Sequence, residues 1–267
     1  MVSHQTQPAE DLNKLGFRLE GFGQWPLDKA LAKIAQIGYR SVELCLEHPG
    51  LCPDSLRGDS IGQIGRSVAD HGLRISSVSH HGKRESLSKA AHNQKLGLEI
   101  AQSLGAHVLV VGAPSTSADP QGCSTFLALE ELVRSAEGTG VVIALEPEPD
   151  TVIHGIYEFS LLAAHLAGSP LALNLDLGHS ALTEGNPLDV IQEWAPFIVH
   201  THVEDIRKPN HTHLLPGDGH LDLLRMIKKL RETGYVGDLT IDLFDILDEP
   251  DVWAKKAMDR MKLLLLQ

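Results

Sequence analysis

Short apolar runs alternate with amphipathic stretches along the whole chain. In the first half, four runs have the length and residue types of strands: residues 15–22, 41–48, 73–80 and 107–114. Residues 26–37 place their apolar side chains on one helical stripe that Gly38 ends, and a longer helical stretch over residues 89–104 ends at Gly105. The first half therefore predicts strands that are separated by helices.

The second half repeats this order. Its strand-like runs are residues 141–147, 171–178, 197–205 and 239–244. Its predicted helices are residues 126–136, 155–166, 187–194, 221–234 and 252–265. Eight strands alternating with helices over short connections favour a closed parallel barrel, with an open doubly wound sheet as the competing arrangement. We therefore predict an α/β protein with a polar N-terminal tail over residues 1–14 and a single (β/α)8 TIM-barrel catalytic domain over residues 15–267.

Composition limits the partners. The 267 residues carry a formal charge of −12, which disfavours nucleic acid and anionic membranes because phosphate binding requires clustered Lys and Arg. The N-terminal residues do not resemble a signal peptide, and no apolar segment is long enough to span a bilayer. Cys45, Cys52 and Cys123 have no metal-ligand spacing, so we interpret them as packing residues in a reducing compartment. We expect a cytoplasmic protein.

Four polar residues stand at the ends of strands five to eight, where a TIM barrel builds its active site. Side chains alternate along a strand, so Glu146, Asp176, His202 and Asp242 each follow inward-facing positions and reach one mouth. Each residue alone is more simply explained as a solvated strand end. Three carboxylates and one imidazole in register instead predict a divalent-metal site.

The histidines add to this picture, since six of the fifteen lie between His179 and His220. One of His80 and His81 should face the mouth, with a contact to an N-terminal helix as the alternative. His211 and His213 belong either to a flexible polar loop or to an extended loop that turns both rings inward, towards substrate or another metal. Glu148 is expected on the surface, because alternation points it away from the mouth.

The motifs "ALEP", "DLGH", "HTHVED", "PGDGHLD" and "GYVGDLTID" together resemble the xylose isomerase-like barrels, which include sugar isomerases and epimerases and, more distantly, endonuclease IV. The resemblance spans nearly the whole chain. It implies one divalent ion bound by Glu146, Asp176, His202 and Asp242, with Glu146 and Asp242 also serving as the catalytic base and acid. It further implies that His179 contacts a substrate oxygen.

The sequence departs from the family pattern in several places. Asp242 stands where glutamate is usual. The family commonly has a substrate-binding arginine six residues after the strand-seven histidine; this chain has Arg207 at five residues and Lys208 at six, and either could bind substrate. His213 falls where the endonuclease branch has a second-metal histidine, and His211 falls where that branch has an aspartate. The "PGDG" segment is slightly better explained as a tight turn than as a phosphate cradle.

This inventory predicts a metal enzyme acting on a small carbohydrate or cyclitol. An oxygen-rich site with one imidazole suits Mn²⁺, Mg²⁺ or Co²⁺, and the many nearby histidines keep Zn²⁺ open. The expected reaction is isomerisation or epimerisation of a sugar, sugar phosphate or keto-cyclitol through an enediolate. The alternatives are a dehydratase acting on a keto-sugar or keto-cyclitol, a multi-metal phosphodiester hydrolase of the endonuclease IV type, and a non-catalytic binding barrel. The oligomeric state stays open, with a homo-oligomer among the alternatives.

Overall fold

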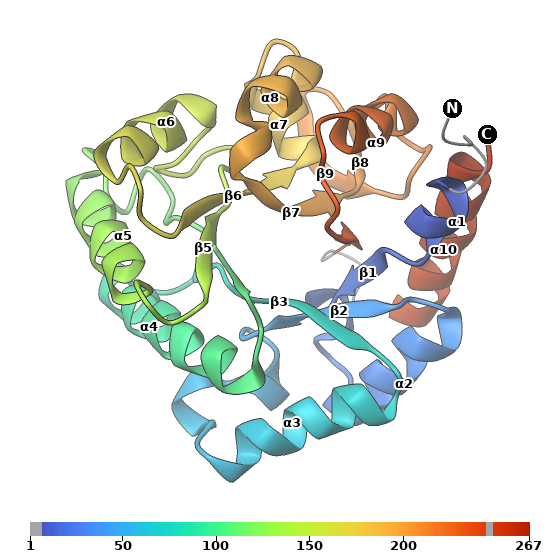
Figure 1. The fold of residues 1–267 in the computed structure, drawn as a ribbon, viewed down its shortest axis with the longest axis horizontal. Helices are drawn as coiled ribbons and strands as arrows, with labels where there is room; N and C mark the ends of the chain where they lie inside the picture. The colour runs from blue at the N-terminus through green and yellow to red at the C-terminus, as the bar shows by residue number, and fades with distance from the viewer. Residues whose placement is uncertain (1–6, 244–247) are drawn as a thin grey trace.

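Eight parallel strands close into one barrel in the computed structural model, which describes residues 7–243 and 248–267 (Figure 1). The strands are β1 (Leu15–Arg18), β2 (Ser41–Cys45), β3 (Arg74–His80), β4 (Val108–Val111), β5 (Val142–Leu145), β6 (Leu171–Asp176), β7 (Ile198–Val203) and β10 (Leu239–Ile241). Their order around the barrel is β1-β10-β7-β6-β5-β4-β3-β2. Because β1 pairs with both β2 and β10, the predicted (β/α)8 barrel is confirmed and the open sheet is wrong.

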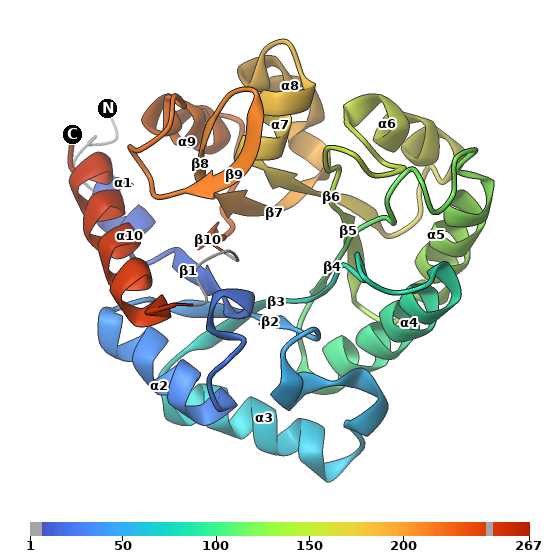
Figure 2. The same ribbon diagram turned by 180° about the vertical axis from the view of Figure 1, so that it is seen from behind.

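Helices surround this barrel, and their ring is seen in both end views (Figures 1 and 2). They are α1 (Gln7–Leu12), α2 (Leu27–Ile37), α3 (Asp59–Asp70), α4 (Leu87–Leu104), α5 (Cys123–Ser135), α6 (Ile156–His165), α7 (Leu177–Thr183), α8 (Pro187–Trp194), α9 (Leu223–Glu232) and α10 (Pro250–Leu265). The sequence analysis did not predict α3 or α7. It also treated α1 as tail, whereas the buried Asp11 carboxylate accepts a hydrogen bond from Arg231 at 2.7 Å; residues 1–6 of that tail lie outside the described residues.

Local signals in the sequence account for where two of the predicted helices begin and end. The α2 helix stops at Gly38, whose φ of 111° lies in the left-handed region that glycine adopts without strain. The Ser86 hydroxyl caps the N-terminus of α4 by accepting a hydrogen bond from the backbone N–H of Lys89, and Gly105 ends that helix. These caps fix the ends of helices that bury one face against the barrel.

The two faces of the barrel strands differ in character. Outward-facing residues such as Phe17, Leu44 and Val78 are fully buried in the apolar layer between strands and helices. The inward-facing residues are largely polar and also buried: Arg18, Ser41, Glu43, Ser77, Asn174, His200 and Thr240. A polar barrel interior must satisfy its hydrogen bonds internally, so these side chains are expected to form networks.

A two-stranded antiparallel hairpin follows β7 and stands beside the barrel mouth (Figure 2). It consists of β8 (Asp205–Arg207) and β9 (Asn210–Leu214), in a region that the sequence analysis described only as a loop. The "PGDG" segment then turns around Asp205, whose carboxylate accepts the backbone N–H of Gly217 at 2.9 Å. Gly217 has a φ of 88°, and a Cβ at Gly219 would lie 2.1 Å from the Asp205 carboxylate. These positions need glycine, which supports the tight-turn interpretation.

Two compositional predictions can be compared with the structure. Cys45 is buried, but Cys52 and Cys123 are exposed, so the packing interpretation holds for Cys45 alone. Across residues 7–243 and 248–267, none of the helices combines the length and the apolar character needed to cross a membrane.

Candidate active site

The four predicted metal ligands come together at the mouth of the barrel. Register places Asp176 on β6 directly opposite His202 on β7. The Nδ1 atom of His202 lies 3.1 Å from Glu146 Oε2, 3.7 Å from Asp242 Oδ2 and 4.0 Å from Asp176 Oδ2. All four side chains are at most 2 % exposed. Three carboxylates and one imidazole therefore converge on one point, as the strand alternation predicts.

Two of these carboxylates each have one oxygen anchored and the other open. Asp176 caps the start of α7, because its Oδ1 accepts the backbone N–H of His179 at 2.6 Å. Asp242 Oδ2 accepts a hydrogen bond from Arg18 Nη1 at 2.9 Å. Asp176 Oδ2 and Asp242 Oδ1 are buried and accept no hydrogen bond within the described part of the chain. Buried carboxylate oxygens without a donor are costly, so these atoms are suited to a cation or a substrate hydroxyl.

The Glu43 carboxylate fixes the orientation of the His202 ring. Its Nε2 lies 2.9 Å from Glu43 Oε2, which accepts the Nε2 proton, and its Nδ1 points towards Glu146. The Glu43 carboxylate also accepts a hydrogen bond from the Ser77 hydroxyl at 2.8 Å. A carboxylate behind an imidazole is the usual way in which proteins orient a metal-binding histidine. Nδ1 is therefore the nitrogen available to a metal ion.

Burial and neighbouring charges shift the pKa values of the residues in this cluster. Burial raises the pKa of Glu146, but the rings of His202 and His81 outweigh it and hold that pKa well below its usual value. Burial lowers the pKa of His202, but Glu43 and Glu146 outweigh it and raise that pKa well above its usual value. Burial raises the pKa of Asp176. These effects keep Glu146 ionised and His202 protonated until another cation takes the place of the proton at Nδ1.

Three histidines form a second group beside the first. The ring centres of His179 and His211 are 4.6 Å apart, and one nitrogen from each of His179, His211 and His213 lies within 4.8 Å of the others. His213 Nδ1 also donates to the backbone carbonyl of Asp242 at 3.0 Å. Burial holds the pKa of His179 well below its usual value, so this ring is neutral. The β9 strand therefore turns His211 and His213 inward, which excludes the flexible-loop interpretation.

Of the two adjacent histidines at the end of β3, His81 faces the cluster. Its Nε2 lies 2.9 Å from Glu146 Oε2, and its Nδ1 accepts a hydrogen bond from Arg18 at 2.9 Å. His80 points elsewhere, because its Nε2 lies 2.9 Å from the Glu85 carboxylate. The inward-facing Ser77 lies four residues before His81. Because side chains alternate with a period of two along a strand, the sequence could have predicted that His81, and not His80, faces inward.

The remaining predicted substrate contacts are not brought into the cluster. Arg207 is exposed and donates to the backbone carbonyl of Asp218 at 2.6 Å, and Lys208 is exposed beside it on the hairpin. Glu148, expected on the surface, is only 4 % exposed and pairs with Lys83 at 2.5 Å. Lys83, which follows the β3 strand, thus pairs with a buried carboxylate, whereas Arg207 and Lys208 stay exposed on the hairpin.

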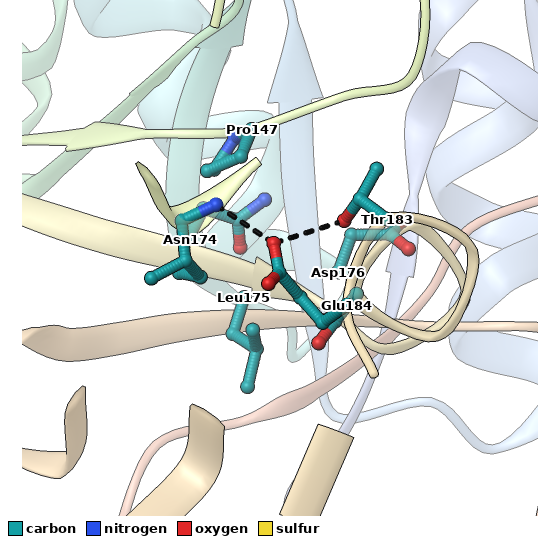
Figure 3. A pocket seen from close by; sticks show the side chains of 8 residues that line it. Pro147, Asn174, Leu175, Asp176, Thr183 and Glu184 are labelled. Atoms are coloured by element: carbon teal, nitrogen blue, oxygen red, sulfur yellow. Dashed lines mark hydrogen bonds between the residues drawn. The ribbon is translucent and has the colours of Figure 1, made fainter. Parts of the chain in front are cut away.

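A small pocket lies beside Asp176 (Figure 3). The carboxylate of Glu184 accepts hydrogen bonds there from the Thr183 hydroxyl at 3.2 Å and from the backbone N–H of Ile156 at 2.9 Å. The free volume of about 10 Å³ is room for one water molecule. A sugar does not fit in this pocket.

Comparison with known proteins identifies the family of this chain. The sequence model of the family described as "Xylose isomerase-like TIM barrel" matches residues 31–264. This chain belongs to that family. The sequence is also similar to fructoselysine 3-epimerase of Escherichia coli O157:H7, which is 24 % identical over 94 % of this chain and 98 % of the relative.

Two solved structures of epimerases have a similar fold. The D-allulose 3-epimerase from Methylomonas sp., in complex with D-allulose, has a TM-score of 0.73 at 17 % identity and covers 94 % of this chain and 96 % of its own. A structure of L-ribulose 3-epimerase has a TM-score of 0.73 at 19 % identity, covering 94 % of each chain. The resemblance noted in the sequence is confirmed.

In this xylose isomerase-like chain, the residues are well suited to hold a divalent metal. Asp176 Oδ2 and Asp242 Oδ1 are buried and have no hydrogen-bond donor among residues 7–243 and 248–267, and Glu146 supplies a third carboxylate. Oxygen-rich sites with one imidazole are typical of Mn²⁺, Mg²⁺ and Co²⁺. The donor set therefore fits the metal that the sequence predicts.

The sequence analysis missed several polar residues of the site. Arg18, Glu43 and Asn174 are buried and contact a predicted ligand directly. Asn174 donates to Glu146 Oε2 at 2.7 Å, so it helps to fix the carboxylate. The available signal was again alternation, which places each of these residues on the inward face of its strand.

Proposed function

We propose that this protein is a divalent-metal-dependent epimerase or isomerase that acts on a ketose or keto-cyclitol through an enediolate. One observation carries the proposal: Glu146 and Asp242 lie on either side of His202, at 3.1 and 3.7 Å from its Nδ1. In the barrel, β6 and β7 separate the strands that carry these two carboxylates. They are thus placed to serve opposite faces of one substrate.

Epimerisation next to a carbonyl requires removal of a proton from one face and its return to the other. One of Glu146 and Asp242 accepts the proton from the carbon, and the other returns a proton to the opposite face. Their neighbours hold the pKa of each carboxylate below its usual value despite burial, so either one can act as the base. The other must first take up a proton from water, which it then gives to the enediolate carbon, and the proton held by the base returns to water to reset the site. A divalent ion in the site would supply Lewis-acid polarisation of the carbonyl.

The surrounding histidines supply orientation. His179 is neutral and buried, and its Nδ1 lies 3.3 Å from Glu146 Oε1. Its Nε2 has no hydrogen-bond partner within the described residues, so this nitrogen can donate to or accept from a substrate hydroxyl. His211 lies beside it at the edge of the mouth. The 3-epimerase relatives support a ketose as the substrate class.

The test combines turnover with exchange. Wild-type protein loaded with Mn²⁺ is incubated in deuterated water with a panel of ketoses, ketose phosphates and keto-cyclitols, and NMR follows both product and deuterium at the carbon next to the carbonyl. Glu146→Gln and Asp242→Asn should each lower turnover by about 10²-fold or more, the contribution of a general acid or base. Glu130→Gln, on the surface beside Arg134, is the control. Near-normal turnover in both amide variants would refute the assignment.

A second candidate rests on the group formed by His179, His211 and His213, whose nitrogens are close enough to hold another ion. Such a group would suit a multi-metal phosphodiester hydrolase. Cleavage of a phosphodiester with more than one bound metal, and no exchange into any ketose, would favour this function. Release of water from a keto-cyclitol would instead identify a dehydratase, and no turnover with any substrate would favour a binding barrel.

A further inference from the structure

Arg18, at the end of β1, lies inside the mouth of the barrel and is only 2 % exposed. Among the described residues it is the one Lys or Arg that is buried. Burying a guanidinium is costly unless every nitrogen has a partner. Its position beneath the proposed catalytic carboxylates therefore calls for an explanation.

Each nitrogen of Arg18 has a separate partner. Nε pairs with Glu43 at 3.1 Å, Nη1 pairs with Asp242 at 2.9 Å, and Nη2 donates to His81 Nδ1 at 2.9 Å. Nη2 also pairs with Glu20, which is about one-third exposed, at 2.5 Å. Arginine presents its donors in a rigid plane, so one side chain fixes the relative positions of these groups.

Those partners are in turn bonded to the other members of the site. His81 bonds to Glu146 at 2.9 Å through its other nitrogen. Glu43 bonds to His202 at 2.9 Å. Arg18 thus reaches Asp242 directly and both Glu146 and His202 through one intermediate side chain.

The contact with Asp242 also explains how a shorter carboxylate can serve at this position. Arg18 holds Oδ2, while Oδ1 is buried and accepts no hydrogen bond from any residue that the structure describes. A carboxylate anchored through one oxygen presents the other in a fixed direction. The side chain therefore does not need the extra methylene of glutamate to have a defined position.

We infer that Arg18 is a positioning residue that holds the acid–base pair and the metal-binding imidazole in one arrangement: Asp242 directly, Glu146 through His81, and His202 through Glu43. This inference rests on the proposed function for its catalytic part. Its effect on the metal site can be measured independently of any turnover.

The decisive variant is Arg18→Lys, which keeps the positive charge but has one nitrogen in place of three. Mn²⁺ affinity is measured by calorimetric titration. The kinetic constants kcat and KM are measured at saturating Mn²⁺, and folding is followed by the midpoint of urea unfolding in EDTA. Loss of residues that orient metal ligands typically costs about 10–100-fold. We expect Mn²⁺ affinity and kcat each to fall by about that factor, with KM changing less than about threefold.

The matched control is Glu20→Gln, which removes the partly exposed partner of Arg18 and leaves the buried contacts in place. It should stay within about threefold of wild type in both measurements, since partly exposed ion pairs contribute little. Glu43→Gln tests the arm to His202 and should weaken Mn²⁺ binding about tenfold or more.

Wild-type Mn²⁺ affinity and kcat in a folded Arg18→Lys variant would overturn the inference. An equal loss in Glu20→Gln would overturn it as well, because a general charge effect would then suffice. If Arg18→Lys does not fold, Glu43→Gln decides, and unchanged Mn²⁺ binding there refutes the arrangement. If wild type binds Mn²⁺ but turns over no sugar, the proposed function fails while the affinity comparison still tests Arg18.

Discussion

Acid should destabilise this barrel through one buried imidazole, His200. Burial lowers the pKa of His200 from its usual value to about 4. Its Nδ1 donates to Asn174 Oδ1 at 2.8 Å, and its Nε2 accepts from the Thr240 hydroxyl at 3.2 Å. Nε2 also lies 3.0 Å from the Ser77 hydroxyl oxygen. Protonation places a charge on a ring that burial has removed from water, and this loss of solvation destabilises the folded state.

The sign follows from proton binding. The folded pKa of about 4 lies below the unfolded value of about 6.5, so between these values the unfolded chain binds more protons and stability falls as pH falls. At about 1.36 kcal/mol for each pKa unit, the full effect is about 3 kcal/mol, most of which is lost between pH 7.5 and 4.5.

The assay is urea unfolding in EDTA at pH 7.5 and 4.5, with wild type, His200→Gln and the exposed control His107→Gln. Because buried carboxylates titrate in the same range, the informative quantity is the difference in pH dependence between the variants. His200→Gln should be less stable than wild type at pH 7.5, but its further loss by pH 4.5 should be smaller by about 2 kcal/mol. Equal losses in all three proteins would refute the reasoning.

Three further predictions concern the site and the N-terminal helix. Asp176→Asn and His202→Asn should each lower Mn²⁺ affinity by at least about 10-fold in calorimetry while the circular dichroism spectrum stays that of a folded barrel, since strand-end ligands lie outside the packed layers. His211→Ala should lower kcat/KM by about 10-fold with Mn²⁺ content unchanged by elemental analysis, because a lost hydrogen bond to substrate costs about 1.4 kcal/mol. Asp11→Ala should cost about 2 kcal/mol in urea unfolding, because it removes the charged hydrogen bond to Arg231 in α9, which keeps only its bonds to the carbonyls of Tyr235 and Gly237. A cost below about 0.5 kcal/mol would restore the description of residues 7–12 as tail.

The sequence predicted those parts of the fold that depend on periodicity. All eight barrel strands were found within the expected runs, and Glu146, Asp176, His202 and Asp242 converge because strand register and alternation are regular. The missed elements are those in which local context decides. The α7 helix begins immediately after β6, because the Asp176 carboxylate caps it, and this seven-residue helix has too few turns to show a periodic pattern.

The hairpin after β7 was missed for a related reason. Its strands β8 and β9 are three and five residues long and carry mainly polar side chains, so no hydrophobic alternation marks them. What stabilises the region is largely the Asp205 carboxylate, which organises the following turn through backbone N–H groups. A contact of this kind depends on the folded chain path and has no signature in residue spacing.

Arg18 and Glu43 show where sequence reasoning could have gone further. Gly16 faces inward, since a Cβ there would lie 3.2 Å from the Thr240 hydroxyl oxygen, and alternation then places Arg18 inward as well. The same rule places Glu43 inward on the next strand, opposite Arg18 in the register. An arginine inside a barrel is stable only where carboxylates surround it, so its presence on strand one itself predicts an acidic mouth. The sequence leaves open which carboxylates Arg18 contacts. The contact with Asp242 depends on the pairing of β1 with β10, which brings together two residues from opposite ends of the sequence.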